Sequence, residues 1–219
     1  MIKSETAAGE TPKYEIADLL VSRTDQRGTI LSVNEAFERI SCHDWENLNN
    51  APHNLIRHPD MPKGVFWLIW EALKQKKPIG AFQKNATKNG TFYWVFTFFA
   101  PQGDGYVSIS MKPTSRAVEM ISNEYAALLE RETEEDLSAD QCAVHFLERI
   151  NGLGCNTYDH FVASLAFEQI RARDKVLRHS CPDRIEKLAE ITTEWGKVQS
   201  QCDRIKDAHG QISNTPTNL

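Results

Sequence analysis

The chain has 219 residues, of which 41% are hydrophobic and 25% are charged, and its formal net charge is −5. These values are ordinary for a globular protein, and the acidic balance argues against sequence-independent nucleic-acid binding, which needs a basic surface. No run approaches the roughly 18 apolar residues of a membrane span, and the polar N-terminal stretch carries no signal-peptide core. We therefore expect a cytoplasmic protein with no membrane span.

The first part of the chain predicts two short strands and two helices. Residues 16–33 contain two apolar runs separated by a turn, and residues 34–40 have helical spacing with Asn34 as a suitable N-cap. A proline-rich loop follows over residues 52–62, because proline removes backbone donors and excludes a central strand or long helix. Residues 65–74 are apolar nearly all round, which predicts a buried helix.

Three further strands are predicted over residues 78–85, 93–99 and 106–111, and an Asn-Gly turn at residues 89–90 joins the first two. The order of elements predicts an α+β fold over residues 15–113: a five-stranded antiparallel sheet covered on one face by short helices.

The second half is predicted to be all-α. Ser115 is expected to cap a helix with apolar positions from Val118 to Leu128, and the acidic stretch 130–136 is expected to be solvated. Further helices are predicted over 139–150, 159–177 and 185–205. The last helix has a narrow apolar seam, which fits either an intramolecular bundle or an intermolecular coiled coil. The seam consists of Leu188, Ile191, Trp195, Val198, Cys202 and Ile205.

These patterns predict four segments. A flexible N-terminal segment covers residues 1–14, and the α+β domain follows over residues 15–113. A connecting signalling helix is predicted over residues 114–136, and a helical bundle or coiled-coil region over residues 137–219.

The proline-rich loop has unusual chemistry. Arg57, His58 and Asp60 can donate and accept hydrogen bonds in a fixed arrangement, as recognition of a polar, anionic or heteroaromatic ligand requires. The alternative is an ordinary solvated loop whose charges pair with one another.

The loop is part of a wider resemblance over most of residues 15–125. The motifs are Asn34-Glu35-Ala36-Phe37, the string P-H-N-x-x-R-H-P-D-M-P at 52–62, Lys84-Asn85, and Tyr93-Trp94-Val95. Together they resemble the PAS domains of bacterial aerotaxis receptors. The resemblance implies a PAS fold whose cavity holds FAD non-covalently between the sheet and the helical face of residues 34–73. It also implies a non-enzymatic redox or oxygen sensor that signals through its trailing helices, as a homodimer, to chemotaxis or other signalling proteins.

The resemblance also assigns the flavin contacts. Amides and an imidazole suit the pyrimidine edge and N5 of the ring, Arg57 suits anionic acceptors, and Trp70 or Tyr93 would give a flat wall. Phe66 and Trp67 are expected in the core. The cysteine motif of flavin-cysteinyl light sensors is absent. The implied cofactor-binding residues are Asn34, His53, Arg57, His58, Asp60, Trp70, Asn85 and Tyr93.

Other sites are weighed against this one. His53 or His58 could be the axial ligand of a haem, and an empty PAS domain could serve as a dimerisation module. The five cysteines include no C-x-x-C pair, and the Cys and His residues after position 141 are irregularly spaced, which favours reduced thiols in a bundle core over zinc. Neither a nucleophile elbow nor a phosphate-binding loop is present, so we expect no enzyme.

Overall fold

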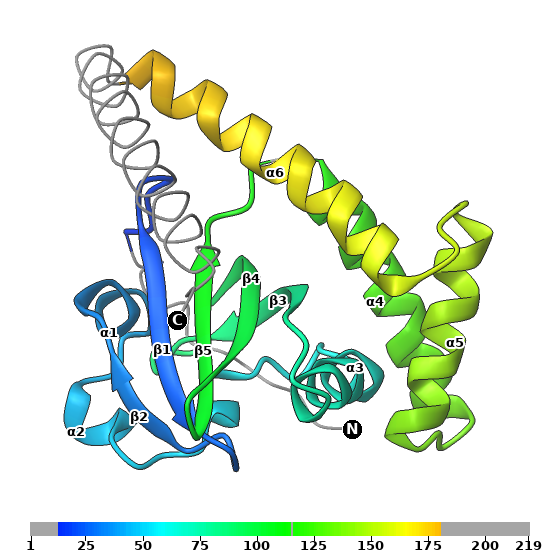
Figure 1. The fold of residues 1–219 in the computed structure, drawn as a ribbon, viewed down its shortest axis with the longest axis horizontal. Coiled ribbons are helices and arrows are strands. Elements are labelled where there is room, and N and C mark those ends of the chain that lie inside the picture. The colour runs from blue at the N-terminus through cyan, green and yellow to red at the C-terminus, as the bar shows by residue number, and fades with distance from the viewer. Residues whose placement is uncertain (1–12, 115, 181–219) are drawn as a thin grey trace, which may run out of the picture. The chain divides into compact units, whose positions relative to one another are not determined.

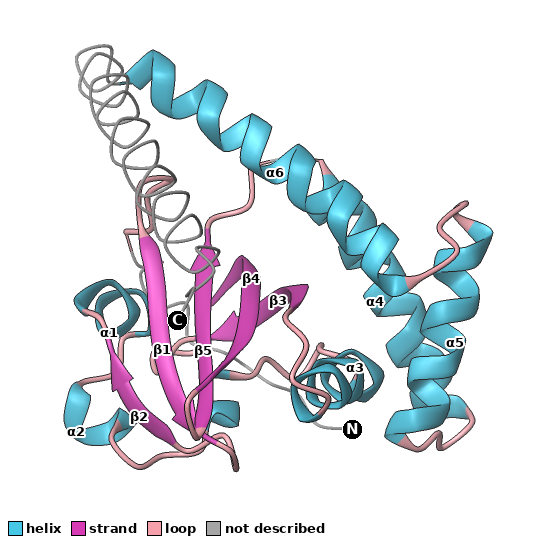
Figure 2. Ribbon diagram, in the orientation of Figure 1, coloured by secondary structure: helices cyan, strands magenta, loops and turns pink. Residues whose placement is uncertain are grey.

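The computed structural model describes residues 13–114 and 116–180, and its centre is a five-stranded antiparallel sheet of strand order β2-β1-β5-β4-β3 (Figures 1 and 2). The predicted sheet is therefore confirmed. The strands are β1 (Leu19–Asp25), β2 (Ile30–Val33), β3 (Ile79–Ala86), β4 (Phe92–Gln102) and β5 (Gly105–Met111).

The turn between β1 and β2 is built by Asp25. Its Oδ1 accepts hydrogen bonds from the backbone amides of Arg27 and Thr29, both at 2.8 Å. Gly28 completes the turn with a φ of 81°, a left-handed conformation that favours glycine. This turn brings Gly28 against the indole of Trp70.

Four short helices connect β2 to β3. They are α1 (Glu35–Ser41), α2 (Trp45–Leu48), the 3₁₀ helix η1 (His53–Ile56) and α3 (Lys63–Lys74). The predicted N-cap of α1 is confirmed, because Asn34 Oδ1 accepts a hydrogen bond from the Phe37 amide. The proline-rich loop thus contains one 3₁₀ turn and leads directly into α3.

Three longer helices follow the sheet: α4 (Ala117–Glu134), α5 (Ala139–Gly152) and α6 (Tyr158–Ser180). In Figure 1, α4 and α5 lie beyond β3, and α5 runs beside α3. Two buried tyrosines attach these helices to the edge strand β3.

The attachment uses backbone acceptors of β3. Tyr125 of α4 donates its hydroxyl to the Phe82 carbonyl, and Tyr158 of α6 donates to the Gly80 carbonyl, both at 3.0 Å. Phe82 itself is 2% exposed. The helices that follow the sheet in sequence therefore cover its second face at β3, whereas Leu19, Phe98 and Ile109 on the other strands stay 37–42% exposed.

The structure corrects two expectations about burial. Trp67 on α3 is 37% exposed, because it lies on a face of the helix that neither the sheet nor α5 covers completely. Glu132, in the stretch predicted to be solvated, is 6% exposed because it packs between α3, α4 and α5.

Some predictions are not decided by the structure. Ser115 and the seam of residues 188–205 lie outside the described residues. The boundaries at residues 14, 113 and 136 stay predictions, although a single compact unit extends to Asp174 and includes the sheet and most of the following helices. In the part of the chain that is described, no helix has the length and apolar character that crossing a bilayer requires.

Candidate functional site

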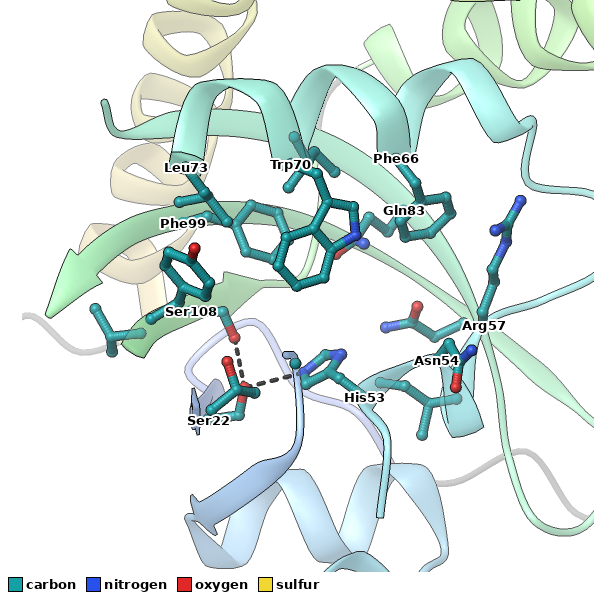
Figure 3. A pocket seen from close by; sticks show the side chains of 17 residues that line it. Ser22, His53, Asn54, Arg57, Phe66, Trp70, Leu73, Gln83, Phe99 and Ser108 are labelled. Carbon is teal, nitrogen blue, oxygen red and sulfur yellow. Dashed lines mark hydrogen bonds between the residues drawn. The ribbon is translucent and has the colours of Figure 1, made fainter. Parts of the chain in front are cut away.

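A cavity of about 90 Å³ lies between the inner face of the sheet and the helices η1 and α3 (Figure 3). One wall is apolar and comes mainly from α3, through Phe66, Ile69, Trp70 and Leu73. The opposite wall is more polar and comes from β1, β3, β5 and η1. An apolar cavity with a few convergent polar groups is the usual form of a small-molecule site.

Three side chains form a hydrogen-bonded chain on the polar wall. Ser22 Oγ lies 2.7 Å from Ser108 Oγ and 3.0 Å from His53 Nε2. Burial lowers the pKa of His53 to about 4. The imidazole is therefore neutral at pH 7, with one nitrogen as a donor and the other as an acceptor.

Arg57 brings a positive charge to the cavity. Its Nη2 donates to the Met61 carbonyl at 2.6 Å, and its guanidinium carbon lies 4.2 Å from the centre of the Phe66 ring. Burial lowers the pKa of Arg57, and the carboxylate of Glu132 opposes that shift. A group whose ordinary pKa is so high stays protonated and can attract an anionic ligand atom.

Trp70 occupies much of the space. Its indole extends from α3 into the middle of the lining side chains (Figure 3) and packs edge-on to Tyr106, with ring centres 5.7 Å apart. A Cβ added at Gly28 would lie 3.0 Å from the Trp70 ring. The size of the cavity therefore depends on the rotamer of this one side chain.

Half of the residues that the resemblance assigns to a flavin line the cavity. His53 comes from η1, Arg57 from the loop after it, Trp70 from α3 and Asn85 from β3. The loop and β3 meet through a bridge between Arg57 and Asn85. Two residues that are 28 positions apart in sequence, 57 and 85, are thus brought to one site.

Asn34 lies outside the cavity lining and holds β1 to α1. Its Oδ1 accepts from the amides of Val21 and Phe37, and its Nδ2 donates to the Leu19 carbonyl at 2.7 Å. All of its bonds are internal to the scaffold, which indicates a structural role.

The other three residues also lie outside the lining. Asp60 Oδ2 pairs with Lys84 Nζ at 2.5 Å, and His58 Nδ1 accepts from the Asp60 amide at 3.1 Å. Tyr93 is 5% exposed in a separate hydrophobic cluster with residues of β1, α1 and η1. Burial raises the pKa of Tyr93, and the neighbouring Asn85 side chain opposes this.

Sequence reasoning missed several lining residues. Phe66, predicted as core, lies in the apolar wall four residues before Trp70 and hence on the same face of α3. Ser22 and Ser108 are paired neighbours on β1 and β5, where a polar residue interrupts an apolar strand at an inward position. Helical spacing and strand alternation could have indicated all three.

The alternative metal site can be compared with the structure only in part, because Cys181 lies outside the described residues. Within residues 13–114 and 116–180, no group of three or more His, Cys, Asp or Glu side chains could hold a metal ion. Cys142, one of the candidates, is fully buried and hydrogen-bonded to Glu132. As predicted for a thiol in a bundle core, it packs among the helices, and burial raises its pKa to about 12.

Comparison with known proteins agrees with the fold. Residues 30–107 match the family model described as PAS fold. Over 114 residues the chain is 37% identical to the aerotaxis receptor of Escherichia coli (strain K12). The aligned part makes up 50% of this chain and 22% of the receptor. The chain thus spans about a fifth of the length of that relative.

Two solved structures are also similar. The PAS domain of a protein from Colwellia psychrerythraea is 18% identical and has a TM-score of 0.40, covering 43% of this chain and 85% of its own. The LOV domain of a blue-light activated histidine kinase from Erythrobacter litoralis is 16% identical and has a TM-score of 0.38. The match covers 42% of this chain and 92% of the LOV domain. On the family match, residues 30–107 form a PAS fold, and the chain is similar in sequence to an aerotaxis receptor.

Proposed function

We propose that the PAS domain binds FAD non-covalently and that the oxidation state of the flavin reports cellular redox or oxygen status through α4–α6. The observation that carries this proposal is the cavity in which His53, Arg57, Trp70 and Asn85 converge. The chain would act without catalysis in the cytoplasm, as a homodimer, on chemotaxis or other signalling proteins. The similarity to an aerotaxis receptor supports this role.

The chemistry of the cavity suits a flavin better than its volume does. The aromatic wall of α3 matches a flat ring system, and the side chains of His53, Gln83 and Asn85 offer donors and acceptors for its polar edge. However, about 90 Å³ is below the roughly 300–1,000 Å³ of common ligand pockets. Binding therefore requires the Trp70 indole to turn and become a wall of the site.

FAD would supply reversible electron transfer, while the protein supplies binding and electrostatics. Arg57 would favour negative charge on the ring or on a phosphate. Because His53 is neutral, its hydrogen bond to Ser22 fixes which ring nitrogen faces the ligand, and that nitrogen could accept or donate as the ligand requires. These three side chains would tune affinity without covalent chemistry.

The test is the absorption spectrum of purified protein, followed by dithionite reduction and reoxidation in air. Flavin gives bands near ~450 nm that bleach on reduction, and haem gives a Soret band. If the protein is colourless and takes up no FAD offered in excess, the sensing proposal is wrong. The small cavity would then favour the second candidate, a PAS dimerisation module without a ligand.

Two variants test the site itself. Arg57→Ala is expected to lower FAD occupancy about tenfold, because it removes a charge at the cavity. Asp60→Ala is the matched variant, since the Asp60 side chain is 56% exposed and paired with Lys84 outside the lining. We expect a smaller loss for it, measured by flavin release from the folded protein. Full occupancy of Arg57→Ala would remove that residue from the site.

A further inference from the structure

Helix α3, which forms the apolar wall of the cavity, begins without a cap of its own. Its N-cap is Pro62, which makes no side-chain hydrogen bond to the first turn. The first amides of a helix need acceptors from elsewhere. The backbone amide of Lys63 finds one in Glu132 Oε2, at 2.7 Å and 69 positions away in sequence. A residue of α4 thus caps the helix that bears Trp70.

The same carboxylate also binds α5. Cys142 Sγ donates to Glu132 Oε2 at 3.1 Å, and Lys63 Nζ lies 3.5 Å from Oε1. Glu132 is only 6% exposed, so its charge has to be compensated by these partners and by the positive end of α3. We call the contact among Lys63, Glu132 and Cys142 the three-helix junction.

The junction lies where α3 and α5 are in close contact. A Cβ at Gly64 would lie 2.5 Å from the Ala143 backbone nitrogen, so the two helices are in contact at main-chain level. Close-packed interiors transmit displacement rather than absorb it. If the first turn of α3 moves, α5 therefore has to move with it, or the contacts among Lys63, Glu132 and Cys142 have to break.

Two sets of contacts connect the cavity to the three-helix junction. Trp70 and Phe66 are carried by α3 itself, and both line the cavity. Arg57 stacks on Phe66 and donates to the Met61 carbonyl, two residues before the helix begins. Burial lowers the pKa of Arg57, and the negative charge of Glu132 opposes that shift.

We propose that Glu132 is a positioning residue that couples the contents of the cavity to the placement of α4 and α5. The inference rests on the proposed function, because the ligand that moves Trp70 or engages Arg57 is taken to be FAD. When the wall shifts, α3, α4 and α5 respond together, since the cap of α3 and the bond to α5 share one carboxylate.

The experiment compares hydrogen exchange in the full chain with and without added FAD, in segments 63–66 and 139–146. Wild type is compared with Glu132→Gln, and Glu130→Gln, an exposed residue on the same helix, is the matched control. In wild type and in the control, FAD is expected to change exchange in both segments. In Glu132→Gln, FAD still binds, but the change in segment 139–146 is lost.

A second readout separates coupling from mere stability. Glu132→Gln removes a negative charge near Arg57, so the midpoint potential of the bound flavin should become more positive, while Glu130→Gln leaves it unchanged. An unchanged potential together with an intact FAD response in segment 139–146 would overturn the proposal. If the Glu132 variant does not fold, Cys142→Ala tests the proposal instead, because it removes only the hydrogen bond between Glu132 and α5. In this variant, FAD should no longer change exchange in segment 139–146.

Failure of the proposed function has a different signature. If wild type binds no FAD, the junction is still tested without ligand. Glu132→Gln should then speed exchange about five- to tenfold in both segments, because a neutral amide oxygen is a weaker acceptor than the carboxylate for both the Lys63 amide and the Cys142 thiol. Faster exchange in segment 63–66 alone, or in neither segment, would refute the junction irrespective of any cofactor.

Discussion

The two faces of β3 differ in chemistry. Toward the cavity, β3 presents Gln83 and Asn85, which are 5% and 6% exposed. Toward α4–α6 it presents Gly80 and Phe82, which are covered by aromatic side chains and by tyrosine hydrogen bonds. One face is polar and loosely filled, and the other is dense and apolar. We therefore expect stability to depend most on the outer face, and the proposed ligand to contact the inner face.

The largest effect is expected on the dense face. Phe146 of α5 is 1% exposed and packs edge-on against Tyr125, with ring centres 5.6 Å apart. Phe146→Ala should lower the free energy of unfolding by about 3–5 kcal/mol, because it leaves a cavity. Urea denaturation measures the loss, and Val144→Ala, on the same helix at 54% exposure, should cost under about 0.5 kcal/mol. Equal losses would contradict the assignment of the core.

On the polar face, His53 should make stability depend on pH. Its pKa is lowered to about 4 in the folded protein, so between that value and about 6.5 the unfolded chain binds more protons. Its contribution is therefore fully present above about pH 6.5 and falls as the pH drops toward 4, by up to about 3 kcal/mol. His53→Asn should flatten this part of the curve of unfolding free energy against pH. An unchanged slope would show that the imidazole is not buried.

The contact between α3 and α5 should be sensitive to a single methyl group. Gly64→Ala places a Cβ against the Ala143 backbone and should cost about 1–3 kcal/mol of unfolding free energy. Gly152→Ala is the matched control, since a Cβ there meets nothing within 4 Å. Thermal melts of the two variants give the comparison, and equal melting temperatures would argue against the close approach.

The smallest effect distinguishes a scaffold residue from a ligand contact. Asn34→Ala should cost about 1–2 kcal/mol through loss of the cap of α1 and of its bonds to β1. Asp44, the N-cap of α2, makes no side-chain cap bond, so Asp44→Ala should cost less. If FAD binds, its occupancy per folded Asn34→Ala molecule should equal that of wild type. A selective loss of flavin would restore Asn34 to the binding site.

Local signals were sufficient for most of the fold. Alternation and turn residues identified the five strands, and helical spacing identified α1, α3, α4, α5 and α6, because these patterns follow from backbone geometry within a few residues. The short helices α2 and η1 were not predicted. The motif string around Arg57 also pointed to the part of the chain that forms one side of the cavity. These features could be predicted because their causes lie close together in sequence.

Only the tertiary structure decided which side chains are buried and which residues far apart in sequence bind one another. An acidic residue in a polar stretch looks solvated, yet Glu132 is enclosed because α3 lacks a cap and α5 offers a thiol. Asp60, which the resemblance assigns to the flavin, pairs with Lys84 on β3 and lies outside the cavity lining. The chain itself determines which residues can bind a charge or a ring, whereas the packing of distant elements decides which of them face the cavity.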